Sequence, residues 1–119
     1  MFTEILREVV EKTDGAIASV LMGFDGITVD TYAPGESPFD VETVGMEYSV
    51  VLTQIKQAAE MLEIGNTTEV AVQAENMTTL IRLLTDEYFI ALAIQPGGNY
   101  GKGRYMLRIQ APKLVENLT

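Results

Sequence analysis

The chain contains no cysteine and no histidine, and it contains no tryptophan. Without cysteine there is no disulfide framework and no thiol chemistry. The commonest general base and the best zinc ligands are missing as well. Carboxylates remain as ligands for Mg²⁺ or Ca²⁺, but the aspartates are scattered at turns, where aspartate is favoured for backbone reasons. We therefore expect no catalytic residues, no metal site and no cofactor, and we expect that the protein is not an enzyme.

Positive charge is scarce. Eight lysines and arginines stand against 17 aspartates and glutamates, which gives a formal net charge of −9. This balance disfavours nucleic acid and anionic membrane surfaces, because both would be repelled. No apolar run approaches the roughly 18 residues of a membrane span, and the first residues are acidic and amphipathic rather than basic and then apolar. We expect a cytoplasmic protein that binds no nucleic acid and does not insert into membranes.

The length of 119 residues favours one domain over residues 1–119. Hydrophobic periodicity and turn residues predict the order helix, two strands, helix, three strands, helix. The last helix contains Pro112 and is predicted to kink or split there. The predicted elements cover residues 2–12, 16–22, 27–33, 41–64, 68–74, 77–84, 88–94 and 104–118.

Two of the predicted strands, 16–22 and 88–94, are apolar almost throughout. Such strands are covered on both faces, so we place them at the centre of the sheet. The connections are of hairpin length, and Asp25-Gly26 is a strong hairpin signal. The prediction is an α+β fold, in which helices cover both faces of a five-stranded, mostly antiparallel sheet in the order α-β-β-α-β-β-β-α.

The helix over 41–64 carries apolar residues on two opposed sides. One broad stripe is predicted to cover the sheet. A helix with a second apolar side is usually buried twice, which favours a subunit interface. Scattered exposed apolar residues, or burial beneath a loop, are the alternatives. The sheet-facing stripe is Val41, Val44, Tyr48, Val51, Leu52, Ile55, Ala58, Ala59 and Leu62, and the opposite side carries Met46, Val50, Met61 and Ile64 with Gln57 between them.

The strand over 68–74 alternates around Val70 and Val72. At a sheet edge it would expose unpaired backbone groups, which proteins normally cover or pair. Two copies related by a twofold axis can pair these edges and pack their long helices together. The predicted dimer or partner interface is therefore Met46, Val50, Gln57, Met61, Ile64, Val70 and Val72.

A glycine-rich stretch over 97–104 precedes the last helix. It is not a phosphate-binding P-loop, because Lys102 is followed by Gly103 where the motif needs serine or threonine. The dinucleotide pattern fails too, since Met106 stands where its third glycine belongs. We interpret the stretch as a turn between a central strand and the last helix.

The same region is rich in cations. A helix N-terminus preceded by glycines favours anions, so Lys102 and Arg104 are candidates for an anion or partner contact, together with Tyr100 and Arg108. The alternative is that these cations are solvated partners of acidic side chains. Arg82 is isolated in a predicted strand, and we interpret it as a solvent-facing residue.

Three strings carry a family resemblance. They are Asp14-Gly15-Ala16 before the first strand, Asp25-Gly26-Ile27 at its hairpin, and the stretch 99–108. With the order of the elements, they make the chain resemble the Roadblock family of dynein light-chain-type domains, and most of all its bacterial MglB/MglC-like members. The resemblance implies a Roadblock, profilin-like fold. It also implies a homodimer through the second helix and third strand, with one sheet across both subunits.

The resemblance further implies a noncatalytic adaptor or regulator of a polarity or motility module. Its expected partners are an MglA-type, Ras-like small GTPase, another Roadblock protein, or both. Two alternatives remain. MglB-type members stimulate GTP hydrolysis by reshaping the active site of the GTPase, so direct activation is one. A small-ligand sensor is the other, because further α+β domains with this layout bind metabolites.

Overall fold

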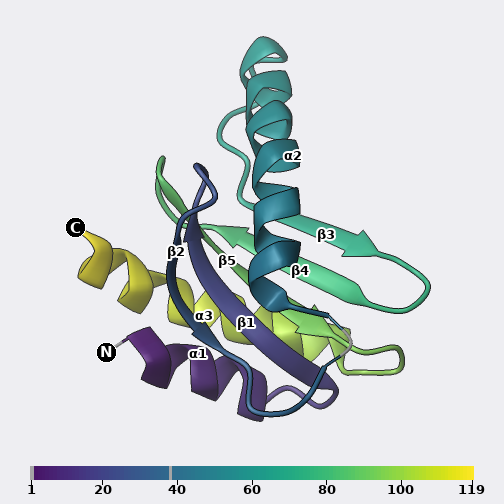
Figure 1. Cartoon of the computed structure of the whole chain (residues 1–119). Helices are drawn as coiled ribbons and strands as arrows, with labels where there is room; N and C mark the ends of the chain where they lie inside the picture. The colour runs from purple at the N-terminus through teal and green to yellow at the C-terminus, as the bar shows by residue number, and fades with distance from the viewer. Residues whose placement is uncertain (1, 38) are drawn as a thin grey trace.

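The fold is α+β in a computed structural model that describes residues 2–37 and 39–119. Within these residues, eight helices and strands follow one another in the predicted order, around a single sheet (Figure 1). The elements are α1 (Phe2–Glu11), β1 (Ala16–Gly23), β2 (Thr28–Tyr32), α2 (Val41–Met61), β3 (Glu69–Gln73), β4 (Thr78–Leu83), β5 (Tyr88–Ile94) and α3 (Tyr100–Leu118).

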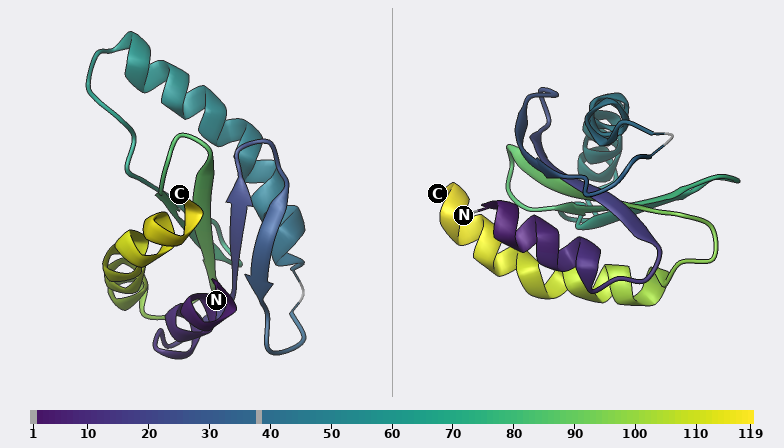
Figure 2. Two further views of the ribbon diagram at one scale, coloured as in Figure 1. Left: turned by 90° about the vertical axis from the view of Figure 1, so that its left-hand side faces the viewer. Right: turned by 60° about the horizontal axis from the view of Figure 1, so that its bottom comes forward.

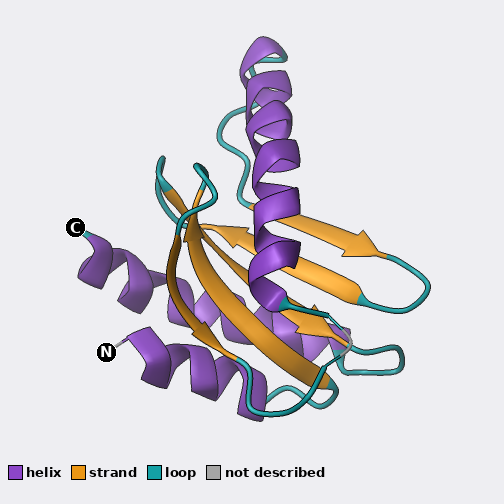
Figure 3. Cartoon of the chain, viewed as in Figure 1, coloured by secondary structure: helices purple, strands orange, loops and turns teal. Residues whose placement is uncertain are grey.

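The sheet has five strands in the order β2-β1-β5-β4-β3, and every neighbouring pair is antiparallel (Figure 3). The two strands predicted to be central, β1 and β5, lie side by side, with Val20 opposite Ala91. On the other side of β5, Ala91 lies opposite Ile81 of β4. The edges of the sheet are β2 and β3. The predicted fold class is confirmed.

The helices cover the two faces of the sheet unequally. Figure 2 shows α1 and α3 together on one face and α2 alone on the other. The face under α1 and α3 holds a core that includes Leu6, Leu92 and Leu107. A second core beneath α2 includes Val20 and Phe89. Most of the sheet is therefore buried on both sides, as the apolar character of β1 and β5 requires.

The last helix begins earlier than predicted. It starts at Tyr100 rather than Arg104, with Asn99 as its N-cap: the side-chain oxygen of Asn99 accepts a hydrogen bond of 3.0 Å from the Lys102 amide. This bond satisfies a first-turn donor that otherwise has no partner inside the helix. The helix also continues through Pro112 as one element, so of the predicted kink or split the split does not occur. Gly101 and Gly103 are therefore helical, whereas Gly97 and Gly98 lie in the predicted turn between β5 and α3.

Gly103 shows why a glycine stands inside this helix. It is buried, and a Cβ atom at this position would lie 2.9 Å from Ile94 Cδ1 and 3.0 Å from Leu80 Cδ1. Glycine normally costs helix stability relative to alanine. Here its lack of a side chain lets the first turns of α3 lie directly on β4 and β5.

Candidate interaction surface

The helix α2 rests on the sheet through a narrow seam of mostly small residues. Its buried positions include Gly45, Ser49 and Ala59. A Cβ on Gly45 would lie 3.0 Å from Met22 Cε and 3.2 Å from Val20 Cγ1, so the helix backbone approaches β1 closely. Val41, Leu52 and Ala59 of the predicted stripe are buried as expected, whereas Gly45 and Ser49 were not part of that stripe. The close approach of the backbone leaves other members of the stripe outside the contact.

Three residues predicted to cover the sheet are exposed. Val51 is 43% exposed, Leu62 is 67% exposed, and Ala58 is exposed as well. The prediction that they cover the sheet is wrong, because α2 packs mainly on β1 and β2. Instead they add to the apolar surface of the helix.

The side of α2 predicted to face a second subunit is exposed in the single chain. Four of its members are large apolar residues, with exposed fractions of 53% for Met46, 63% for Val50, 84% for Met61 and 71% for Ile64. Gln57 is exposed among them, and Ile64 follows the end of the helix. Soluble proteins rarely leave so much contiguous apolar surface without a partner.

The two flanks of α2 face different halves of the sheet. On one flank, Glu42 accepts a hydrogen bond of 3.1 Å from the Thr28 hydroxyl of β2. Helical spacing puts Val51 and Leu62 on the opposite flank, toward β4 and β3. The C-terminal half of α2 extends past β3 (Figure 1). The exposed apolar surface of the helix therefore lies beside an open edge of the sheet.

That edge is β3. Among the described residues it pairs with β4 alone, so its other side carries unpaired backbone donors and acceptors. Val70 and Val72 are half-buried on the face that carries α2, and Val70 packs against the core beneath that helix. The structure thus brings the predicted strand residues to the same side of the sheet as the exposed residues of α2.

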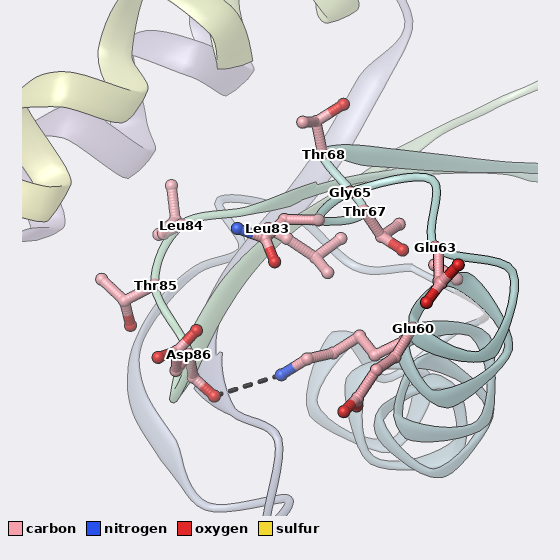
Figure 4. Close-up of a pocket in the computed structure, with 12 residues that line it drawn as sticks. Glu60, Glu63, Gly65, Thr67, Thr68, Leu83, Leu84, Thr85 and Asp86 are labelled. Atoms are coloured by element: carbon pink, nitrogen blue, oxygen red, sulfur yellow. Dashed lines mark hydrogen bonds between the residues drawn. The ribbon is translucent and has the colours of Figure 1, made fainter.

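A hollow of about 740 Å³ lies under the C-terminal end of α2 (Figure 4). Glu60 of α2 and Glu63 in the turn after the helix line it on one side, and Asp86 lines it on the turn between β4 and β5. Lys56 bridges it, because its ammonium donates a hydrogen bond of 3.2 Å to the Asp86 carbonyl. The same ammonium lies 3.7 Å from the centroid of the Phe24 ring. Within the described ranges no three acidic side chains are grouped to hold a metal ion.

Arg104, a predicted contact residue, is engaged within the chain. Its guanidinium lies against the Glu69 carboxylate of β3, with distances of 2.7 Å and 2.9 Å to the same oxygen. The hydrogen bond from this carboxylate raises the pKa of Arg104 above its ordinary value. Its Cζ also lies 5.8 Å from the centroid of the Tyr100 ring. Arg104 therefore fastens the start of α3 to the edge strand.

The other predicted cations lie around Tyr105. Lys102 Nζ is 5.5 Å and Arg108 Cζ is 5.8 Å from the centroid of its ring. Arg82, interpreted from the sequence as isolated, lines the same hollow as Arg104 and Arg108. The pairing of Arg82 with Glu69 across β4 and β3 brings it there. The sequence alone did not predict that Arg82 lies near these cations, because that proximity depends on the register of the strands.

Known structures resemble the whole chain. Crystalline MglC from Myxococcus xanthus is 44% identical, and the match covers 98% of each chain with a TM-score of 0.70. The chain belongs to the Roadblock family as an MglB/MglC-like member. A Roadblock/LC7 domain from Streptomyces avermitilis shares the fold at 13% identity and a TM-score of 0.85, covering 98% of this chain and 96% of its own. Gliding protein MglB from Thermus thermophilus matches at 17% identity and a TM-score of 0.84, covering 95% of this chain and 84% of its own.

This Roadblock domain matches neither a protein-family model nor a curated protein. Across the described part of the chain, no helix combines the length and apolar character that crossing a bilayer requires.

Proposed function

We propose that this Roadblock protein is a noncatalytic, homodimeric adaptor in a cytoplasmic polarity or motility module. Its partners in this proposal are an MglA-type, Ras-like GTPase, another Roadblock protein, or both. The observation that carries the proposal is the exposed apolar surface of α2 beside the unpaired edge of β3. The similarity to MglC and MglB supports the choice of module.

The geometry of α2 and β3 suits a twofold dimer. A second copy that pairs its own β3 with the free edge would continue the sheet. Because α2 extends past β3, its C-terminal half would then reach over the sheet of the partner (Figure 1). This arrangement buries Met61, Leu62 and Val51 without moving α2 from its own sheet. A related observation is that an MglB structure is described as tetrameric.

An adaptor role also fits the chemistry of the surface. The candidate residues of α2 and β3 are apolar apart from Gln57, so they offer contact area and not acid–base groups. Among the cations, Arg104 is held by Glu69 and is not free to reach a nucleotide. Such a protein acts by binding and positioning its partners.

Two experiments test the proposal. Sedimentation velocity of the purified chain should show a dimer, and a species that stays monomeric at tens of micromolar contradicts dimerisation. A pull-down from native cell extract, with GDP and with a nonhydrolysable GTP analogue, should retain a small GTPase or a Roadblock protein. Recovery of neither class under either nucleotide contradicts the adaptor role.

Direct activation of the GTPase is separable from adaptor binding. Single-turnover GTP hydrolysis by the recovered GTPase is measured with and without the chain. The adaptor proposal predicts an unchanged rate although the proteins bind. A hydrolysis rate that rises with the concentration of the chain would contradict the adaptor proposal and support a GTPase-activating role.

A further inference from the structure

Half of the basic residues of this acidic chain gather on one side of α3. They are Arg82, Lys102, Arg104 and Arg108, out of eight lysines and arginines. Two adjoining hollows, of about 200 Å³ and about 460 Å³, share Arg82 and Arg108 in their linings. We call the two hollows together the α3 groove. The groove lies between α3 and β4, on the opposite face of the sheet from α2 (Figure 2).

The charges of the α3 groove are incompletely balanced. Glu69 engages Arg104. Among the described residues, no carboxylate forms an ion pair with Arg82, Lys102 or Arg108. Glu69 and Glu116 line the two hollows with Arg82, Arg104 and Arg108, so arginines outnumber carboxylates there although the chain has 17 acidic side chains. Like charges that share one hollow repel each other, and an anionic group between them relieves that repulsion.

The larger hollow of the groove adds an apolar part. Leu84, Ala111 and Val115 line it next to the two arginines, and Leu84 packs on the same face of the sheet as α3. A simple inorganic anion gains nothing from such a lining, whereas an apolar side chain is stabilised by burial there. The groove thus combines cations with an apolar surface, as sites for short peptide segments do.

The backbone of α3 contributes a further polar group. Pro112 has no N–H, so the carbonyl of Arg108 lacks the donor that a helix normally supplies four residues later. Pro112 and Arg108 both line the groove. A peptide backbone brings N–H donors to such a carbonyl, which a phosphate or a lipid acyl chain does not.

We propose that the α3 groove binds an acidic peptide segment of a partner protein. Its carboxylates contact Arg82 and Arg108, and an apolar side chain beside them lies along Leu84 and Val115. A long polyanion fits less well. The rest of the chain is strongly negative, and a nucleic acid or anionic membrane extends beyond the roughly 8 Å over which salt screens charge. This surface is separate from α2 and goes beyond the dimer proposed above.

The test uses a labelled peptide in which glutamates flank a leucine–valine pair, followed by fluorescence anisotropy. We expect saturable binding by the full chain, and about tenfold weaker binding by Arg108→Glu and by Arg82→Gln. Lys113→Glu is the matched control, because Lys113 lies on the same helix outside the groove lining. It should change the affinity by less than about twofold, as an exposed charge contributes little.

Two further peptides separate charge from apolar contact. Replacing the glutamates by glutamines should abolish binding, and replacing the leucine–valine pair by serines should weaken it. Absence of binding to the original peptide, or equal binding by Arg108→Glu and wild type, overturns the proposal. So does Arg108-dependent binding of an oligonucleotide or of phosphatidylserine vesicles in place of the peptide. Sedimentation of the same variants should show unchanged self-association, so failure here is distinguishable from failure of the dimer.

Discussion

Val50 gives a sharp perturbation of the proposed dimer. It lies within α2 and is 63% exposed in the single chain, so the fold itself depends little on its side chain. Glutamate is also a slightly better helix former than valine. We therefore expect Val50→Glu to leave the folded monomer intact and to change its unfolding free energy by no more than about 0.5 kcal/mol.

The effect on the dimer should be far larger. Burying the exposed share of a valine stabilises an interface by about 1.5 kcal/mol per copy. A glutamate loses this and leaves an unpaired polar group in the contact, which costs about 1.5 kcal/mol more. Twofold symmetry applies the change in both copies, so the dimer loses about 6 kcal/mol. At about 1.4 kcal/mol per factor of ten, Kd rises by about four orders of magnitude.

Sedimentation equilibrium over a range of concentrations measures this change. The matched control is Ile109→Glu, which also replaces a β-branched apolar residue by glutamate, on α3 at a position that is 41% exposed. Circular dichroism checks that each variant is folded. The reasoning is refuted if Val50→Glu associates like wild type, or if Ile109→Glu dissociates the dimer equally.

Three smaller predictions concern the fold. Gly103→Ala should lower the unfolding free energy by about 1 kcal/mol, because overpacking against Ile94 and Leu80 exceeds the gain in helix propensity. Gly101→Ala should raise the unfolding free energy by about 0.5 kcal/mol, since only Asn99 Oδ1 lies near the added Cβ, at 3.9 Å. Urea unfolding at one protein concentration compares the two variants. Asn99→Ala removes the cap of α3 and should cost about 1 kcal/mol in the same assay, and an unchanged midpoint would contradict the capping role. The hydrogen bond from Lys12 lowers the pKa of the Glu8 carboxyl in the folded chain. The stability that this bond contributes is therefore complete above the pKa of Glu8 in the unfolded chain and is lost as the pH falls through the pKa of Glu8 in the folded chain. NMR titration should show the Glu8 pKa rising in Lys12→Ala.

The fold was largely predictable because local signals agreed with one another. The uninterrupted apolar character of β1 and β5 placed them at the centre, and short turns made the sheet antiparallel. The start of α3 was missed for a physical reason. Gly101 and Gly103 indicate a loop by composition, but the cap at Asn99 and the close packing of Gly103 on the sheet make them helical.

The orientation of α2 was predicted only in part. Periodicity ranks residues by hydrophobicity, so it placed Val51 and Leu62 on the sheet. The structure buries Leu52 of the predicted stripe and adds Gly45 and Ser49, because small residues allow the backbone to approach β1. Hydrophobic pattern alone cannot find a seam of this kind. It did find that one side of the helix remains exposed and apolar.

The α3 groove could not be predicted from the sequence. Arg82 and Arg108 are distant along the chain, and the packing of α3 on β4 brings them together. The cation pattern of α3 was visible, but its partner on the sheet was not. Long-range register is the information that a single sequence lacks here.

The pairing of β3 with its counterpart in a second copy is the central claim, and a distance measurement tests it most directly. The chain has no cysteine, so Ala71→Cys, at the middle of β3, accepts a single spin label. Paired edge strands lie about 4.8 Å apart, which keeps the two Ala71 backbones within about 15 Å for any register in which the strands overlap. Pulsed electron–electron double resonance should therefore give one short distance. Absence of dipolar coupling, or a distance near the 39 Å long axis of the protomer, would contradict the account.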